Sequence, residues 1–133
     1  MNTVDSDSDS GPGSAVPLRR RMRAALTVAM KARDRAAVSA LRSALAAVEN
    51  AEAVNRGAGA DERLAIEQIP VGLGAAEVER RVLTEAEQRR IVRAEQAERE
   101  AAAEGYESAG RPERAERLRA EAAVLAGQLA AAR

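Results

Sequence analysis

The sequence predicts an all-α protein, a small bundle of two antiparallel helical hairpins. About a quarter of the 133 residues are alanine and 32% are charged, a composition that favours solvent-exposed helices. Apolar residues recur every three or four positions along most of the chain, which is the period of an amphipathic helix. Glycine and proline gather at a few points, where helices are expected to end. A chain of this length supports one domain with a modest core.

Residues 1–17 form a low-complexity acidic segment in which Asp5, Asp7 and Asp9 alternate with serine. This segment has almost no apolar surface to bury, so we predict a disordered tail there. The helical domain then spans residues 18–133. It divides into a first hairpin at 18–56, a long loop at 57–75 and a second hairpin at 76–131.

In the first hairpin, one helix is expected from about Pro17 to Arg33. Asp34 is a natural N-cap for the next helix, which is expected to end near Val54. The apolar stripes of these two helices predict their buried faces. The stripe residues are Leu18, Met22, Ala25, Leu26, Ala29 and Met30 in the first helix, and Val38, Leu41, Leu45 and Val48 in the second.

The predicted loop at 57–75 begins with Gly57 and Gly59 and continues through Pro70. Alternating aliphatic residues between Leu64 and Leu73 favour a short extended piece or hairpin. A loop of this length in a small domain is either functional or mobile, and its five aliphatic residues suggest that it lies against the bundle. A short helical turn is expected at 77–82.

The second hairpin carries the clearest local signals in the chain. Thr84 followed by Glu87 predicts a capping box at a helix start. Gly110 can adopt the left-handed conformation that ends a helix, and Pro112 suits the first position of the next one. The connection is so short that the two helices must lie antiparallel.

Charged residues interrupt the faces that should pack together. In the third helix the expected line runs through Ile91, Glu95, Arg99 and Ala102, and neighbouring helices place Arg42 and Glu121 on similar faces. Charges at a helix interface must be paired, because their desolvation is costly. We therefore predict an internal salt-bridge network, with a binding pocket as the alternative. Its members are Arg42, Glu95, Arg99 and Glu121.

The charge is balanced overall but not evenly distributed. Residues 18–56 carry nine basic and three acidic residues, a net of +6, although the whole chain has 21 of each. Basic residues on the outer face of the first hairpin are candidates for contacting a polyanion, and a solvated helix face is the alternative. These residues are Arg20, Arg23, Lys31 and Arg35. The lack of interleaved aromatic residues argues against base stacking.

Several function classes are disfavoured by what the sequence lacks. It contains no cysteine and no histidine, the commonest metal ligand and neutral-pH general base. The abundant glutamates lie on helices at three- and four-residue spacing from arginines, which is typical of solvated ion pairs. Examples are Glu95 with Arg99 and Glu113 with Arg117. We expect no catalysis, no metal and no cofactor. With no long apolar run, we expect a cytoplasmic protein with no membrane contact.

The residues also resemble a known family. Ala29-Met30-Lys31-Ala32-Arg33-Asp34, then Leu41-Arg42 and Asn50, are similar to the opening of YqeY-like proteins of the GatB/YqeY family. The match continues through Leu83-Thr84, Arg99 and the turn formed by Tyr106, Gly110 and Arg111, and it covers roughly 18–56 and 76–129. The chain differs from the family at Gln128-Leu129-Ala130, where Tyr-Leu-Pro usually leads into a second small helical domain.

The resemblance implies an all-helical domain related to the tail of the amidotransferase B subunit, which contacts tRNA. That enzyme forms the amide of a misacylated tRNA with glutamine as donor, and its catalytic groups lie in domains absent here. We therefore expect a non-catalytic module that assists tRNA or an aminoacyl-tRNA-processing protein. The alternative is a protein-interaction module that uses the 64–73 segment or a helix face. An aliphatic core this small predicts either marginal stability for a lone monomer or a homodimer.

Overall fold

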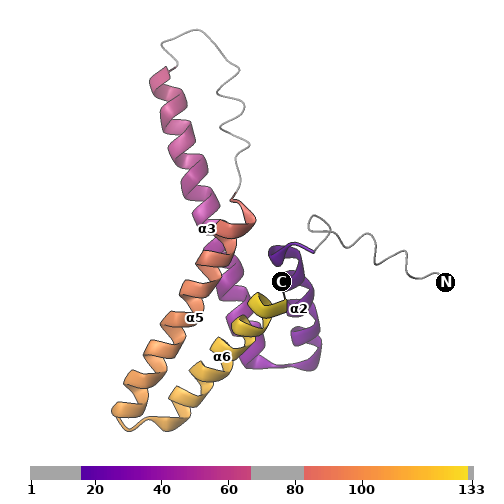
Figure 1. The fold of residues 1–133 in the computed structure, drawn as a ribbon, viewed down its shortest axis with the longest axis vertical. Coiled ribbons are helices and arrows are strands. Elements are labelled where there is room, and N and C mark those ends of the chain that lie inside the picture. Colours follow the sequence, from indigo (N-terminus) through magenta and orange to yellow (C-terminus); the bar gives the residue numbers. More distant parts are fainter. Residues whose placement is uncertain (1–15, 67–82, 132–133) are drawn as a thin grey trace, which may run out of the picture.

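The computed structural model describes residues 16–66 and 83–131, with side chains at 16–55 and 83–131. The described regular structure is entirely helical (Figure 1). A turn at Arg33 and Asp34 joins the first pair of helices, and a turn at 109–111 joins the second. The all-α prediction of a small helical bundle is therefore confirmed. The helices are α2 (Leu18–Ala32), α3 (Arg35–Ile66), α5 (Glu85–Ser108) and α6 (Pro112–Ala131).

Side-chain caps explain the predicted starts of α3 and α5. An oxygen of Asp34 accepts a hydrogen bond from the backbone N–H of Ala37 at 3.1 Å, which satisfies one of the free donors of α3. At α5 the hydroxyl of Thr84 accepts from the N–H of Glu87 at 3.0 Å, and the Glu87 carboxylate accepts from the N–H of Thr84 at 2.8 Å. The capping box is therefore confirmed.

The α5–α6 turn also forms as predicted. Gly110 has a φ of 79°, in the left-handed region where glycine avoids a side-chain clash. The backbone N–H of Arg111 donates to the carbonyl of Tyr106 at 2.8 Å, which closes the end of α5. Pro112 is the first residue of α6, where its missing N–H leaves no hydrogen bond unmade.

The predicted loop at 57–75 is wrong over its first ten residues, because α3 continues to Ile66. Gly57 and Gly59 each cost about 1 kcal/mol in a helix relative to alanine, and good helix formers surround both. Proline would stop the helix, but the first one after Arg35 is Pro70. The extended piece expected at Leu64 is likewise helical in its backbone. Residues 67–75 and the turn expected at 77–82 lie outside the described residues.

The predicted tail falls mostly outside the described residues, which begin at Val16. Pro17 is the N-cap of α2, and Val16 precedes it. The carbonyl of Pro17 accepts from the backbone N–H of Arg21 at 3.0 Å, and the carbonyl of Val16 accepts from the Arg21 guanidinium at 3.0 Å. The contacts of the described chain therefore begin two residues before the predicted start of the domain at residue 18.

The core is aliphatic and draws on all four helices. Alanines between the larger side chains let the helix backbones approach closely. Met30 was predicted to be buried, but it is 49% exposed, whereas Ala29 beside it in the last turn of α2 is buried. The largest fully buried side chains are Leu18, Met22, Leu41, Val48, Val92 and Leu125.

The buried line of α5 is displaced from the one that the sequence predicted. Val92 and Ala103 are fully buried, whereas Ile91 and Ala102, one residue earlier in each case, are only partly buried. The reason is that α5 contacts α3 as well as α6, so its most buried line points between the two neighbours. One residue along a helix corresponds to a rotation of about 100°. Over the described helices, none is both long and apolar enough to cross a membrane.

Candidate anion-binding site

Three of the four basic residues predicted to bind a polyanion share one face of α2, whereas the fourth lies on α3. Arg20, Arg23 and Lys31 are exposed and fall at helical spacing, with Arg20 and Lys31 about three turns apart. Arg23 lies 3.5 Å from Glu49 of α3, and both side chains are 56% exposed, so this ion pair contributes little stability. Arg35 lies at the start of α3, where it belongs to a different group of residues.

Two other arginines of α2 bind to α3 and α6 and stabilise the packing of the helices. Arg19 forms an ion pair with Glu52 of α3, whose carboxylate also accepts from the backbone N–H of Leu83 at 3.4 Å. Arg21 donates to the backbone carbonyl of Gln128 in α6 at 2.8 Å. Since both side chains are held by partners far away in the sequence, they are poorly placed to bind a ligand.

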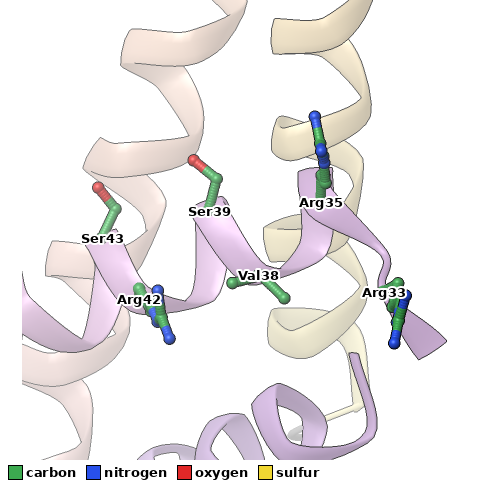
Figure 2. Close-up of a pocket in the computed structure, with 6 residues that line it drawn as sticks. All are labelled: Arg33, Arg35, Val38, Ser39, Arg42 and Ser43. Atoms are coloured by element: carbon green, nitrogen blue, oxygen red, sulfur yellow. The ribbon is translucent and has the colours of Figure 1, made fainter. Parts of the chain in front are cut away.

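The first turns of α3 carry an open groove of about 700 Å³ (Figure 2). We call this the arginine groove. Figure 2 shows Arg35, Ser39 and Ser43 projecting from one side of α3, and Val38 and Arg42 from the other. The lining contains cationic and hydroxyl groups but no acid, so it favours an anion with several oxygen acceptors. The residues that line it are Arg33, Arg35, Val38, Ser39, Arg42 and Ser43.

The local sequence explains how the groove forms. Arg33 has a φ of 59°, the left-handed conformation, which ends α2 and lets Asp34 start α3 at once. Ser39 follows Arg35 by four residues, so the two lie along one line of α3. Arg42 follows Val38 by four residues along an adjacent line. No acid occurs from Arg35 through Val48, so Arg42 has no acidic residue three or four positions away. Asp34, beside Arg35, serves as the cap of α3.

A second cavity, of about 360 Å³, adjoins the arginine groove and shares Arg35 and Ser39 with it. We call this the Glu121 cavity. Ala36 completes the α3 side, and α6 contributes Arg117 and Glu121. The sequence suggested that Arg117 pairs with Glu113 four residues earlier. Among the described residues, however, Arg117 makes no ion pair, and neither does Arg33, Arg35 or Arg42.

The structure brings together three of the four residues predicted to form a charge network. Arg99 Nε donates to Glu121 at 2.9 Å, and Arg99 Nη1 donates to Glu95 at 2.9 Å. Burial acts to lower the pKa of Arg99, but the hydrogen bonds and charges of Glu95 and Glu121 outweigh it and raise the pKa. Arg42 does not belong to this group, because its side chain is exposed and lines the arginine groove.

The family-like turn has a structural role in this chain. Gly110 supplies the left-handed conformation, and the N–H of Arg111 bonds to the Tyr106 carbonyl. The guanidinium of Arg114 lies 5.1 Å from the centre of the Tyr106 ring, within the range of a cation–π contact. Arg111 is exposed beside it. These contacts hold the first turn of α6 against the end of α5.

Sequence reasoning missed most of the residues that the structure gathers here. It assigned Arg42 to the internal network and Arg117 to a surface ion pair, and it did not single out Ser39 or Ser43. The absence of acidic residues from Arg35 through Val48 could have indicated from the sequence that the arginines there are unpaired. Where side chains are described, at 16–55 and 83–131, the structure shows no group of three or more carboxylate, histidine or cysteine side chains that could hold a metal ion.

Comparisons of the chain with protein-family models, with curated proteins and with solved structures found no match. A proposal for the function therefore rests on the arginine groove, the Glu121 cavity and the ion pairs of Arg99 with Glu95 and Glu121.

Proposed function

We propose that this protein is a non-catalytic helical module that binds the phosphate backbone of RNA in the arginine groove. The observation that carries the proposal is the set of guanidinium groups around the groove and the adjoining cavity. None of these groups is paired with an acid among the described residues. They are Arg33, Arg35, Arg42 and Arg117.

The chemistry of the lining supports phosphate as the bound group. Guanidinium binds phosphate oxygens through two parallel hydrogen bonds, and the hydroxyls of Ser39 and Ser43 can donate to further oxygens. The chain has a formal net charge of zero, so it has no general attraction for polyanions. Binding must therefore come from the local cluster, which favours one defined contact surface.

The resemblance to YqeY-like proteins supports tRNA as the RNA, with the protein assisting tRNA or a tRNA-processing enzyme such as an amidotransferase. A groove that contacts three or four phosphates binds with modest affinity and a marked dependence on salt. The slope of log affinity against log salt is expected to be about −2 to −4.

The test measures fluorescence anisotropy of labelled tRNA with the full-length protein, at low and near-physiological salt. The groove variant replaces Arg33, Arg35 and Arg42 with glutamine. The matched control replaces Arg20, Arg23 and Lys31 with glutamine, which changes the net charge by the same amount. We expect the groove variant to lose binding and to show a flatter salt dependence, while the control stays close to wild type.

Two results would contradict this proposal. One is the absence of binding to wild-type protein even at low salt. The other is an equal loss in both variants, which would indicate a diffuse charge effect without a defined groove. Circular dichroism melting of each variant shows whether it is folded before binding is compared.

A second candidate function, a protein-interaction module, is favoured by the shape of α3. Its distal part extends beyond α2, α5 and α6 (Figure 1). A helical segment that packs against no neighbour is marginally stable in water. A partner helix that packed against the distal part of α3 would therefore stabilise it. Val54 is 70% exposed at the base of this extension. If it belongs to a homodimer interface, Val54→Asp should convert a dimer to a monomer in analytical ultracentrifugation.

A further inference from the structure

The Glu121 cavity is lined by both positively and negatively charged side chains. Arg35 from α3 and Arg117 from α6 provide positive charge, while Glu121 provides a carboxylate. The arginines make no ion pair with Glu121, so each lies more than 4.0 Å from its oxygens. The three groups therefore surround a space and do not neutralise one another by direct contact.

Glu121 is held in place but keeps unused acceptor capacity. The residue is only 8% exposed, and its Oε1 accepts from Arg99 Nε at 2.9 Å. No described residue donates a hydrogen bond to its other oxygen. A carboxylate can accept about four hydrogen bonds, so one donor leaves most of this capacity unused. Because Glu121 lines the cavity, a ligand with a donor group can reach it.

The nature of that ligand follows from the charges. A bare phosphate would be attracted by Arg35 and Arg117 but repelled by the carboxylate of Glu121. A ligand that carries both an anionic group and a neutral hydroxyl satisfies all three residues at once. A ribonucleotide unit has this combination in its phosphate and its 2′-hydroxyl, whereas a deoxyribonucleotide lacks the hydroxyl.

Continuity with the arginine groove favours a ribose over a free small molecule. Arg35 and Ser39 line both spaces, so a nucleic-acid backbone lying in the groove would continue directly into the cavity. On this basis, and resting on the proposed RNA-binding function, we propose that the Glu121 cavity is a ribose site. Glu121 accepts a hydrogen bond from the 2′-hydroxyl, and this contact makes the protein selective for RNA over DNA.

The test uses single-stranded oligonucleotides of one sequence that differ only at the 2′ position of the sugar. The four probes are RNA, DNA, 2′-fluoro RNA and 2′-O-methyl RNA, each labelled for anisotropy and measured with wild-type protein at one salt concentration. The 2′-fluoro probe keeps the sugar conformation of RNA but has no hydroxyl donor. We expect RNA to bind about tenfold more tightly than the other three, because the lost hydrogen bond involves a charged acceptor.

Two variants locate the contact. Glu121→Gln should reduce the preference for RNA over 2′-fluoro RNA to within about twofold, because its amide replaces one charged acceptor oxygen with a donor. Arg117→Gln should weaken all four probes by a similar factor and leave their ratios unchanged, because it removes a phosphate contact. The measurement on wild-type protein decides the proposal even if Glu121→Gln fails to fold.

Four outcomes are informative in different ways. If all four probes bind equally, the ribose site is wrong although the proposed function stands. If 2′-fluoro RNA binds as tightly as RNA while DNA does not, sugar conformation is the basis of selection and the Glu121 contact is again wrong. If no probe binds at low salt although tRNA does, the ribose site is wrong and the proposed function stands. If tRNA fails to bind as well, both fail.

Discussion

The Nε atom of Arg99 on α5 lies 2.9 Å from Oε1 of Glu121 on α6, and this contact links the two helices of the second hairpin. Arg99 Nη1 also donates to the carboxylate and carbonyl of Glu95, at 2.9 and 3.0 Å. The side chains of Arg99 and Glu121 are 11% and 10% exposed, so water screens their interaction only weakly. The same contact that orients α5 on α6 therefore also holds Glu121 beside its cavity.

Replacing Arg99 should destabilise the protein strongly. In Arg99→Ala, the carboxylate of Glu121 would stay buried without a donor from α5, which is costly in a site of low polarity. We expect the free energy of unfolding to fall by about 2 to 4 kcal/mol. Urea denaturation followed by circular dichroism measures this change.

Arg42→Ala is the matched control for that experiment. Arg42 was predicted to belong to the same network, but its side chain is exposed and makes no ion pair with a described residue. Its removal should change the free energy of unfolding by less than about 0.5 kcal/mol. Similar losses in the two variants would show that Arg42 is part of the network after all.

Two glycines should respond to alanine in opposite directions. Gly110 has a φ of 79°, so Gly110→Ala forces a side chain into the left-handed region and should cost about 1 to 2 kcal/mol. Gly105 lies within α5, and a Cβ there would meet nothing within 4 Å. Gly105→Ala should therefore stabilise the protein by about 0.5 to 1 kcal/mol. Thermal melts of both variants check the signs, and a gain in Gly110→Ala would contradict this account.

Arg33 allows stability and binding to be separated. Its left-handed conformation, with a φ of 59°, is unfavourable for a residue with a side chain. Arg33→Gly should raise the free energy of unfolding by about 0.5 to 1 kcal/mol and weaken binding of tRNA, since a groove cation is lost. Denaturation and anisotropy on the same sample test both effects. Arg33→Val should weaken binding and also lower stability.

Asp34 is an acidic residue between two arginines of the groove, Arg33 and Arg35. Asparagine is as good an N-cap as aspartate, so Asp34→Asn should preserve the hydrogen bond to Ala37 and leave the melting temperature nearly unchanged. Removing the negative charge should strengthen tRNA binding at low salt by about twofold, and high salt should abolish the gain. Unchanged affinity at low salt would show that the bound phosphates lie far from Asp34.

The helix ends could be predicted because their causes lie within a few residues of one another. The cap at Asp34, the capping box of Thr84 and Glu87, and the turn at Gly110 and Pro112 each depend on one helical turn of sequence. The end of α3 could not be predicted in this way. Gly57 and Gly59 weaken a helix without stopping it, so a local rule placed its end about twelve residues too early.

The candidate site depended on which arginines the fold leaves unpaired. Arg19 and Arg21 have the same chemistry as Arg33 and Arg35 and lie close to them in the sequence. They are held by Glu52 and by the carbonyl of Gln128, at separations of 33 and 107 residues. Periodicity describes the faces of one helix, so it carries no information about partners that far away.

The sequence by itself determined the all-α class, the helix caps and the α5–α6 turn, because backbone conformation and capping are short-range effects. Only the tertiary structure decided that Val92, and not Ile91, faces the core, that Arg42 lines a groove, and that Glu121 is placed between Arg99 and a cavity. Those outcomes depend on how α3, α5 and α6 pack together. Packing is set by the fit of whole helices, which no single segment contains.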